Sequence, residues 1–473
     1  MITVFAHAGG LLGRADLPIP EWLFGWAAAI VLIVSFVGLA VLWPEPRLER
    51  SGWRPLPRGI GRVIASRPVE IVCGVIGVAL LGAVLYTGFK GTQSPAANFA
   101  PTFVFVNWWV GLVPLSVLFG DVFRAFNPWR AIGRALGWAS ARVVRGGLPA
   151  PLRYPDRLGH WPAAAGVFAF VCLELVKSEG DKPETIAIAA LVYSAITFVA
   201  MALYGVEAWC ERGEAYSVYF NLFSRISPWE TRRAQAAGSA GRAATASPEL
   251  GLRAPLAGLA RFTPVAATPV LLAVMIGSVS FDGAGEAPIW TDTAPHISRF
   301  LQDRGLSPEP AFQLTFLVGL TAAIAIVYGF YRLGILGARS VGGGFSSNQL
   351  ARAFAPSLVP IAFAYVMAHY LTYLLIRGQA LVFLASDPLG NGSNLFHTAN
   401  FQLDYNIIGA KATWYWQVGF VIAGHVAGLT LAHDRALSMY SDAKQAVRSQ
   451  YWMLGVMVGF TSLALWLLSQ ANA

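Results

Sequence analysis

The sequence predicts an all-α fold, a polytopic integral membrane bundle of about ten transmembrane helices. Of its 473 residues, 56% are hydrophobic and only 12% are charged, and the mean hydropathy is +0.55. A soluble domain has about 25% charged residues, so this chain has too few to cover a soluble surface. Its apolar runs are also long enough to cross a hydrocarbon core of roughly 30 Å as helices. We therefore expect a multi-pass protein in contact with the lipid bilayer.

Ten apolar runs define the predicted spans, which form one bundle over residues 1–473. The first run ends in a Pro- and Arg-rich stretch, which is typical of a retained helix rather than of a cleaved signal peptide. The predicted spans cover residues 22–43, 69–89, 101–120, 161–177, 186–208, 262–281, 311–332, 355–376, 412–432 and 451–468.

The basic residues follow the pattern of membrane topology. Loops after the first, third, fifth, seventh and ninth spans contain most of the 34 Lys and Arg residues, and such loops stay on the cytoplasmic side. Residues 121–160 and 211–261 are therefore predicted as basic cytoplasmic loops, and both termini are predicted outside, in a bacterial inner membrane. These loops explain the net charge of +9, and no nucleic-acid-binding motif is present.

The eighth and ninth spans contain the polar residues most suggestive of a site. Tyr365, His369, Thr372 and Tyr373 share one face of the eighth span, because they are spaced as helical neighbours. His425 lies inside the ninth span. Ionisable side chains at membrane depth are costly and by default indicate function.

A metal site between these two spans is the first functional hypothesis. Imidazole suits Zn or Cu, so His369 and His425 are predicted ligands of a divalent transition metal. The polar loop between the spans supplies His397 as a third ligand or a catalytic base, and Asp404 as the other candidate base. A metal with an open position lowers the pKa of its bound water, as hydrolysis requires. Tyr365, Thr372 and Tyr373 are predicted to line the substrate site.

Two other classes of function use the same residues. In a transporter or channel, the histidines and tyrosines would line a substrate or proton path. In a subunit of a membrane complex, the histidines would hold haem or a metal, and the sequence does not identify partner subunits. Gly424 and Gly428 allow close approach of another helix, which favours packing inside the bundle.

Three stretches together carry a resemblance to a known group of proteins. They are DLPIPEWLF at 16–24, HYLTYLLIRGQ at 369–379 and GHVAGLTLAHDRAL at 424–437. The chain resembles bacterial multi-helix membrane proteins, some of which are described as membrane-bound fenitrothion hydrolase. The resemblance implies hydrolysis of an organophosphate triester at a membrane-embedded site, and it supplies no active-site residues.

Overall fold

The computed structural model describes residues 21–64, 66–143, 149–233 and 248–472. Residues 1–20, 65 and 473 lie outside the described residues, as do 144–148 and 234–247 within the two predicted basic loops. The predicted outer N-terminus and residues 16–20 of the first motif therefore fall outside the described part of the chain.

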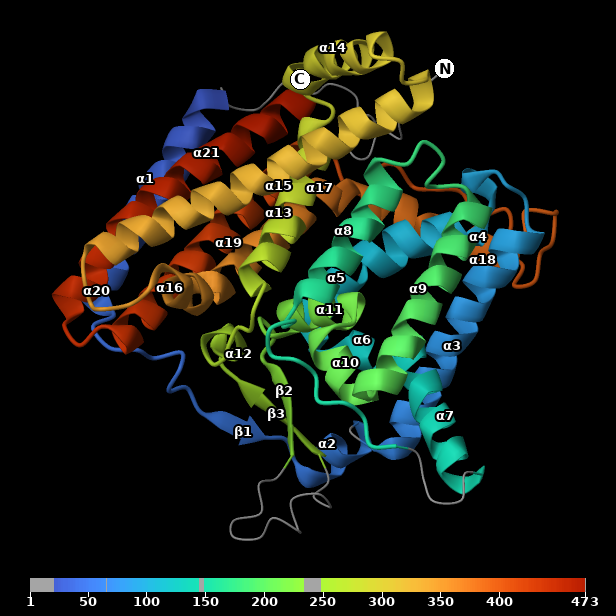
Figure 1. The fold of residues 1–473 in the computed structure, drawn as a ribbon, viewed down its shortest axis with the longest axis horizontal. Helices are drawn as coiled ribbons and strands as arrows, with labels where there is room; N and C mark the ends of the chain where they lie inside the picture. Colours follow the sequence, from blue (N-terminus) through green and yellow to red (C-terminus); the bar gives the residue numbers. More distant parts are fainter. Residues whose placement is uncertain (1–20, 65, 144–148, 234–247, 473) are drawn as a thin grey trace.

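Helices make up most of the described chain and form two neighbouring groups (Figure 1). The first group lies between residues 67 and 224. It comprises α3 (Arg67–Lys90), α4 (Phe99–Pro101), the π-helix η2 (Thr102–Val110), α5 (Leu112–Phe119), α6 (Val122–Phe126), α7 (Pro128–Val143), α8 (Trp161–Leu175), α9 (Pro183–Tyr204), α10 (Val206–Arg212) and α11 (Ala215–Ser224).

The second group contains the C-terminal helices and the first helix, α1 (Glu21–Leu42), which packs against two of them. Its other members are α13 (Thr268–Ala284), α14 (Pro288–Asp303), α15 (Pro308–Ser340), α16 (Ser347–Phe354), α17 (Leu358–Thr372), the π-helix η5 (Tyr373–Arg377), α19 (Ala410–Met439), α20 (Ala443–Ser449) and α21 (Tyr451–Asn472). After η5 the chain crosses to the first group, where α18 (Leu381–Ser386) contacts α4 and η2 (Figure 1). Short helical turns connect these elements, namely α2 (Arg58–Ile64), η1 (Pro95–Ala97), α12 (Ala257–Ala260), η4 (Ala355–Ser357) and η6 (Gly378–Ala380).

A helical segment occupies each of the ten predicted ranges. Seven helices of the described chain are long and apolar enough to cross a membrane, and an eighth counts if the bent pair α13–α14 is one span. α8 has only 15 residues, so it is shorter than the usual span of about 20 residues. The structure thus supports a membrane-embedded helical bundle, and the count of ten spans stays a prediction.

Proline begins several of these helices. Pro162, Pro183 and Pro308 stand in the first turns of α8, α9 and α15. At those positions the missing N–H costs no helical hydrogen bond, and the fixed backbone angle suits a helix start. The starts of these helices therefore follow directly from the sequence.

A small antiparallel sheet adds to the expected all-α architecture. Strands β1 (Trp53–Pro55), β2 (Trp229–Arg233) and β3 (Pro248–Arg253) pair in the order β1-β3-β2. Trp53 pairs with Arg253, and Trp229 pairs with Leu252. The sheet joins segments after the first and fifth predicted spans, both of which were expected to be loops.

The predicted loops 121–160 and 211–261 also contain helices. α7 covers most of residues 121–143 and exposes Leu136 and Trp138, as expected of a helix at a membrane interface. α11 is buried instead, with Phe220 and Phe223 fully enclosed, and it packs on α5, α8 and α17. The second range is therefore part of the bundle core as well as a connection.

The two ends of the bundle differ. The start of α1, the end of α21 and α14 lie at one end, whereas the sheet and α7 lie at the other (Figure 1). α14 bends away from α13 by 91° and exposes Ile289 and Phe300. Charge distribution predicts the α14 end as the outer side.

Candidate functional site

His369 is held by a carboxylate from another helix. Its Nε2 donates a hydrogen bond to Asp282 Oδ2 over 2.9 Å, and the Tyr370 hydroxyl donates to the same oxygen over 2.7 Å. The His369 and Asp282 side chains are only 10% and 9% exposed. Asp282 lies in the last turn of α13, so α13 and α17 together build this cluster.

His425 lies deeper and has different neighbours. It is fully buried, and its Nδ1–H donates to the Val421 carbonyl oxygen over 2.7 Å. Its Nε2 has no hydrogen-bond partner among the described residues. The centroid of its ring lies 6.2 Å from that of Tyr365.

The two loop candidates, His397 and Asp404, are exposed. His397 has a φ of 61°, and Asp404 Oδ1 accepts a hydrogen bond from the Asn406 backbone N–H over 2.8 Å. The Gln379 side chain is bonded to both the backbone N–H and the carbonyl of Asp404, at 2.9 and 3.1 Å. These contacts order the loop, and they leave both side chains at the surface.

The described residues do not bring together a set of ligands for the predicted metal. Among the described residues, no three His, Cys, Asp or Glu side chains come together as a metal site would require. His369 meets Asp282, and His425 meets a backbone carbonyl. A Zn or Cu ion at His369, His425 and His397 therefore stays a prediction without support from these contacts.

A large cavity of about 990 Å³ opens beside the His369 cluster. Its walls come from η2, the α8–α9 turn, the end of α13, α14, the start of α15 and η5. Of the predicted substrate-lining residues, Tyr373 lines it, whereas Tyr365 and Thr372 line neither this cavity nor the smaller one described next. Both Tyr365 and Thr372 are buried between helices.

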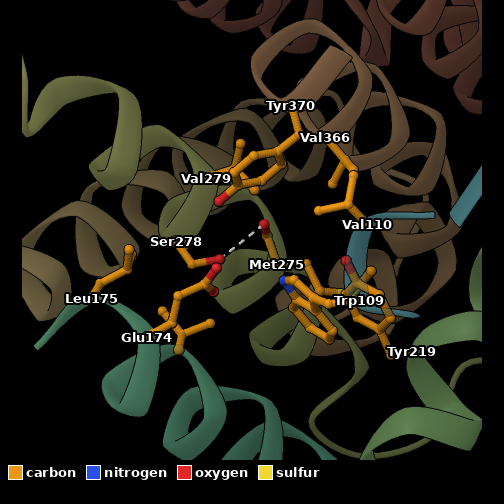
Figure 2. A pocket seen from close by; sticks show the side chains of 11 residues that line it. Trp109, Val110, Glu174, Leu175, Tyr219, Met275, Ser278, Val279, Val366 and Tyr370 are labelled. Carbon is orange, nitrogen blue, oxygen red and sulfur yellow. Dashed lines mark hydrogen bonds between the residues drawn. The ribbon is translucent and has the colours of Figure 1, made fainter. Parts of the chain in front are cut away.

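A second, enclosed cavity of about 10 Å³ lies deeper between the two helical groups. That volume is about enough for one water molecule. Figure 2 shows the Glu174 carboxylate from α8 and the Tyr370 hydroxyl from α17 directed into this space, beside Ser278 of α13. Tyr219 of α11 lines it as well.

Glu174 and Asp282 stand at the junction of the two cavities. Glu174 lines both of them. Asp282 lines the large cavity. Tyr370 lines the small cavity, and its hydroxyl donates a hydrogen bond to Asp282. One carboxylate comes from each helical group, so the junction lies at the interface between the groups.

Irregular backbone marks the same place. The π-helices η2 and η5 pack against each other, and Asn107 Nδ2 of η2 donates to the Gly378 carbonyl oxygen over 3.1 Å. η2 contributes to both cavities, and η5 contributes to the large one. π-Helices are frequent at functional sites, and irregular backbone at membrane depth is tolerated where it lines a cavity.

The lining of the large cavity combines negative charge with aromatic rings. Its acidic residues outnumber the basic ones, Lys177, Arg299 and Arg377. The acidic residues are Glu174, Glu179, Asp181, Asp282, Glu286 and Glu309. The aromatic residues are Phe105, Phe281, Trp290, Phe312, Phe316 and Tyr373. The buried indole N–H of Trp290 has no acceptor among the described residues.

Sequence reasoning found His369 and Tyr373 but missed the two carboxylates that define the junction. Asp282 directly follows the apolar run 262–281, so it was assigned to an outer loop. Glu174 is an acidic residue inside the run 161–177, and that position was a usable signal. Comparisons of the chain with protein-family models, characterised proteins and solved structures gave no match.

Proposed function

We propose that this protein is a membrane transporter that receives a small organic cation with an apolar body in the 990 Å³ cavity. The strongest support is the junction at which Glu174 and Asp282, from the two helical groups, adjoin the deeper water-sized cavity. Carriers place substrate sites between helical groups, beside broken or irregular helices. The paired η2 and η5 segments fit that pattern.

The chemistry of the lining favours a cation. Lys177 and Arg299 are exposed, whereas the Asp282 side chain is only 9% exposed. Arg377 is a partly buried base in the lining, but six acidic residues and six aromatic residues surround the same space, so the lining as a whole suits a cation with an apolar body. Aromatic faces attract cations through their quadrupole, by about 0.5–2 kcal/mol for each contact.

The predicted topology indicates from which side of the membrane the solute enters the cavity. The loop segments that contribute to the cavity, 177–185 and 282–310, carry few basic residues compared with the opposite loops. On the positive-inside rule they face outward, with ten crossings of a bacterial inner membrane. The cavity would thus load its solute from the outer side.

The other predicted functions have less support. Hydrolysis of an organophosphate-type ester, or a haem- or metal-holding role, requires His369, His425 or His397 to act at one site. These histidines have separate partners or lie at the surface. None of the three lines either cavity.

Equilibrium dialysis of ethidium, a planar aromatic cation, against the detergent-purified protein tests the proposal. The wild type should bind ethidium saturably and bind uncharged phenanthridine more weakly. Glu174→Gln and Asp282→Asn should each weaken ethidium binding at least tenfold. A hydrogen bond to a charged group contributes about 1.5–3 kcal/mol, and a loss of about 1.4 kcal/mol of binding free energy raises the Kd tenfold.

A matched control is available on the same face of the molecule. Asp292 is an exposed residue of α14 that does not line the cavity. Asp292→Asn makes the same charge change and should bind ethidium as the wild type does. Equal affinity for ethidium and phenanthridine, or unchanged binding in both cavity variants, would contradict the proposal.

A further inference from the structure

One base in the lining of the large cavity differs from the others. Arg377 ends η5 and is partly buried, whereas Lys177 and Arg299 are exposed. Arg377 lies within the candidate span Ser347–Ser386, where an arginine is costly and by default marks a substrate path or a water-filled cavity. Its guanidinium has no hydrogen bond or ion pair with another described residue. The N–H donors of Arg377 therefore have no competing acceptor in the described chain when a ligand enters the cavity.

The backbone that carries Arg377 is held from two sides. Asn107 Nδ2 of η2 donates to the carbonyl oxygen of Gly378, the next residue, over 3.1 Å. Gln379 Nε2 donates to the carbonyl oxygen of Asp404 over 3.1 Å. The η5 segment also packs against η2. Arg377 thus starts from a fixed position on the cavity wall, and a group that is held in place loses less freedom when it binds a ligand.

Arg377 and the Asp282 cluster lie along one side of a helix. Tyr370 donates to Asp282 over 2.7 Å, and Tyr373 and Arg377 follow Tyr370 on the continuous stretch from α17 to η5. Residues spaced by three and four positions share a side of a helix, and Tyr373 and Arg377 both line the large cavity. With a rise of 1.5 Å per residue, Arg377 lies at most about 10 Å from Tyr370 along the helix axis. The guanidinium and the Asp282 carboxylate therefore border the same cavity at different heights.

Aromatic rings provide a surface for the apolar body of a ligand. Phe281, near the end of α13, lies edge-on to Trp290 at 5.1 Å and to Phe316 at 6.1 Å. All three rings line the large cavity, and so does Tyr373, one helical turn before Arg377. Rings thus accompany both the acidic and the basic part of the lining, which suits a flat molecule with a charge toward each end.

We propose that the transported molecule is a zwitterion, which carries a carboxylate besides its cationic group, and that Arg377 binds this carboxylate. The inference rests on the proposed function and narrows its substrate class. The planar guanidinium matches the two oxygens of a carboxylate. A phosphate group would carry nearly twice the negative charge, so the six acidic residues of the lining would repel it more strongly. The cationic group would lie toward Asp282 and Glu174, and the carboxylate toward Arg377.

Two dyes with the same fused-ring cation test the inference. Tetramethylrhodamine carries a carboxylate near neutral pH, and its methyl ester does not. Equilibrium dialysis against the detergent-purified protein, with binding to protein-free micelles subtracted, gives a Kd for each dye. The wild type should bind the zwitterion at least tenfold more tightly than the ester, because a bidentate, charge-assisted contact is strong.

Arg377→Gln should weaken binding of the zwitterion at least tenfold. It should bind the ester no more weakly than the wild type does, because the change removes a positive charge from the lining. Arg377→Lys keeps the charge without the planar fork and should restore part of the zwitterion binding. Arg304→Gln is the matched control at an exposed residue that follows α14 and does not line the cavity. It should alter neither Kd.

The outcomes separate the inference from the proposed function. Equal or weaker binding of the zwitterion by the wild type, or an equal loss of both dyes in Arg377→Gln, would overturn the inference alone. Unchanged zwitterion binding in Arg377→Gln would overturn it as well. A wild-type protein that binds neither the dyes nor ethidium would overturn the proposed function.

Discussion

The Asp282 carboxylate oxygen that accepts hydrogen bonds from both His369 and Tyr370 explains why a histidine occurs in a span. A buried imidazole needs a partner, and a buried carboxylate needs donors. The two groups satisfy each other while Asp282 still lines the large cavity. His369 is then a positioning residue for that carboxylate. The role we propose for this histidine is therefore to hold a carboxylate, whereas the sequence predicted a metal ligand.

A substitution at His425 distinguishes the predicted metal site from the transporter proposal. With no metal present, His425→Leu should preserve or raise the thermal midpoint in detergent. The change removes a ring nitrogen that has no partner within the described chain, and an unsatisfied buried group costs about 1–3 kcal/mol. Differential scanning fluorimetry with elemental analysis measures both effects.

His397→Asn is the control for that experiment. His397 is exposed with a φ of 61°, a conformation that Asn tolerates well. Both proteins should contain no stoichiometric Zn or Cu. A wild-type protein that holds one metal ion, and that loses both metal and stability in His425→Leu, would restore the metal site as the better explanation.

At the level of elements, the α17–α19 contact was predictable from spacing. Gly424 and Gly428 were expected to admit another helix, and the structure confirms it. A Cβ at Gly424 would lie 2.3 Å from the Ala364 Cβ and 2.7 Å from the Pro360 carbonyl oxygen. At Gly428 it would lie 2.7 Å from the Ser357 carbonyl oxygen. These distances are too short for a real Cβ atom. α17 therefore packs so closely against α19 that only glycine fits at these two positions.

Gly424→Ala should therefore lower stability by about 1–3 kcal/mol, the usual cost of overpacking. Gly419→Ala on the same helix is the matched control, because nothing lies within 4 Å of its added methyl group. Thermal unfolding in detergent should separate the two variants. Equal midpoints would mean that α17 and α19 are not in close contact in the protein.

Other elements lay beyond prediction from the sequence. The strands have three to six residues, which is too short for an alternating pattern to stand out from a basic loop. The π-helices η2 and η5 continue apolar helical runs, so composition gives no sign of them. α11 was assigned to a loop because its neighbours are basic, whereas its own aromatic residues bury it against α5 and α8.

At the scale of the whole molecule, composition predicted the membrane class, and the apolar runs located the helices. The cavity could not be predicted, because it depends on where the chain turns. α14 leaves α13 at 91° and lines the cavity with Trp290 and Arg299. Apolar runs specify how long a helix is, but the direction of the next one follows from tertiary contacts.

The arrangement of the two helical groups also explains why the site was only partly found. Sequence reasoning searched two adjacent spans for partners of His369. The structure instead brings together η2, α8, α11, α13 and α17, which are separated by long stretches of chain. Glu174 and Tyr370 line one cavity only because these elements converge there.

Ethidium counterflow into proteoliposomes that contain the wild-type protein tests the central claim most directly. The account predicts saturable exchange well above that of protein-free vesicles, and loss of this exchange in Asp282→Asn. The contradictory result is exchange no faster than in protein-free vesicles, together with release of nitrophenol from fenitrothion by the same purified protein.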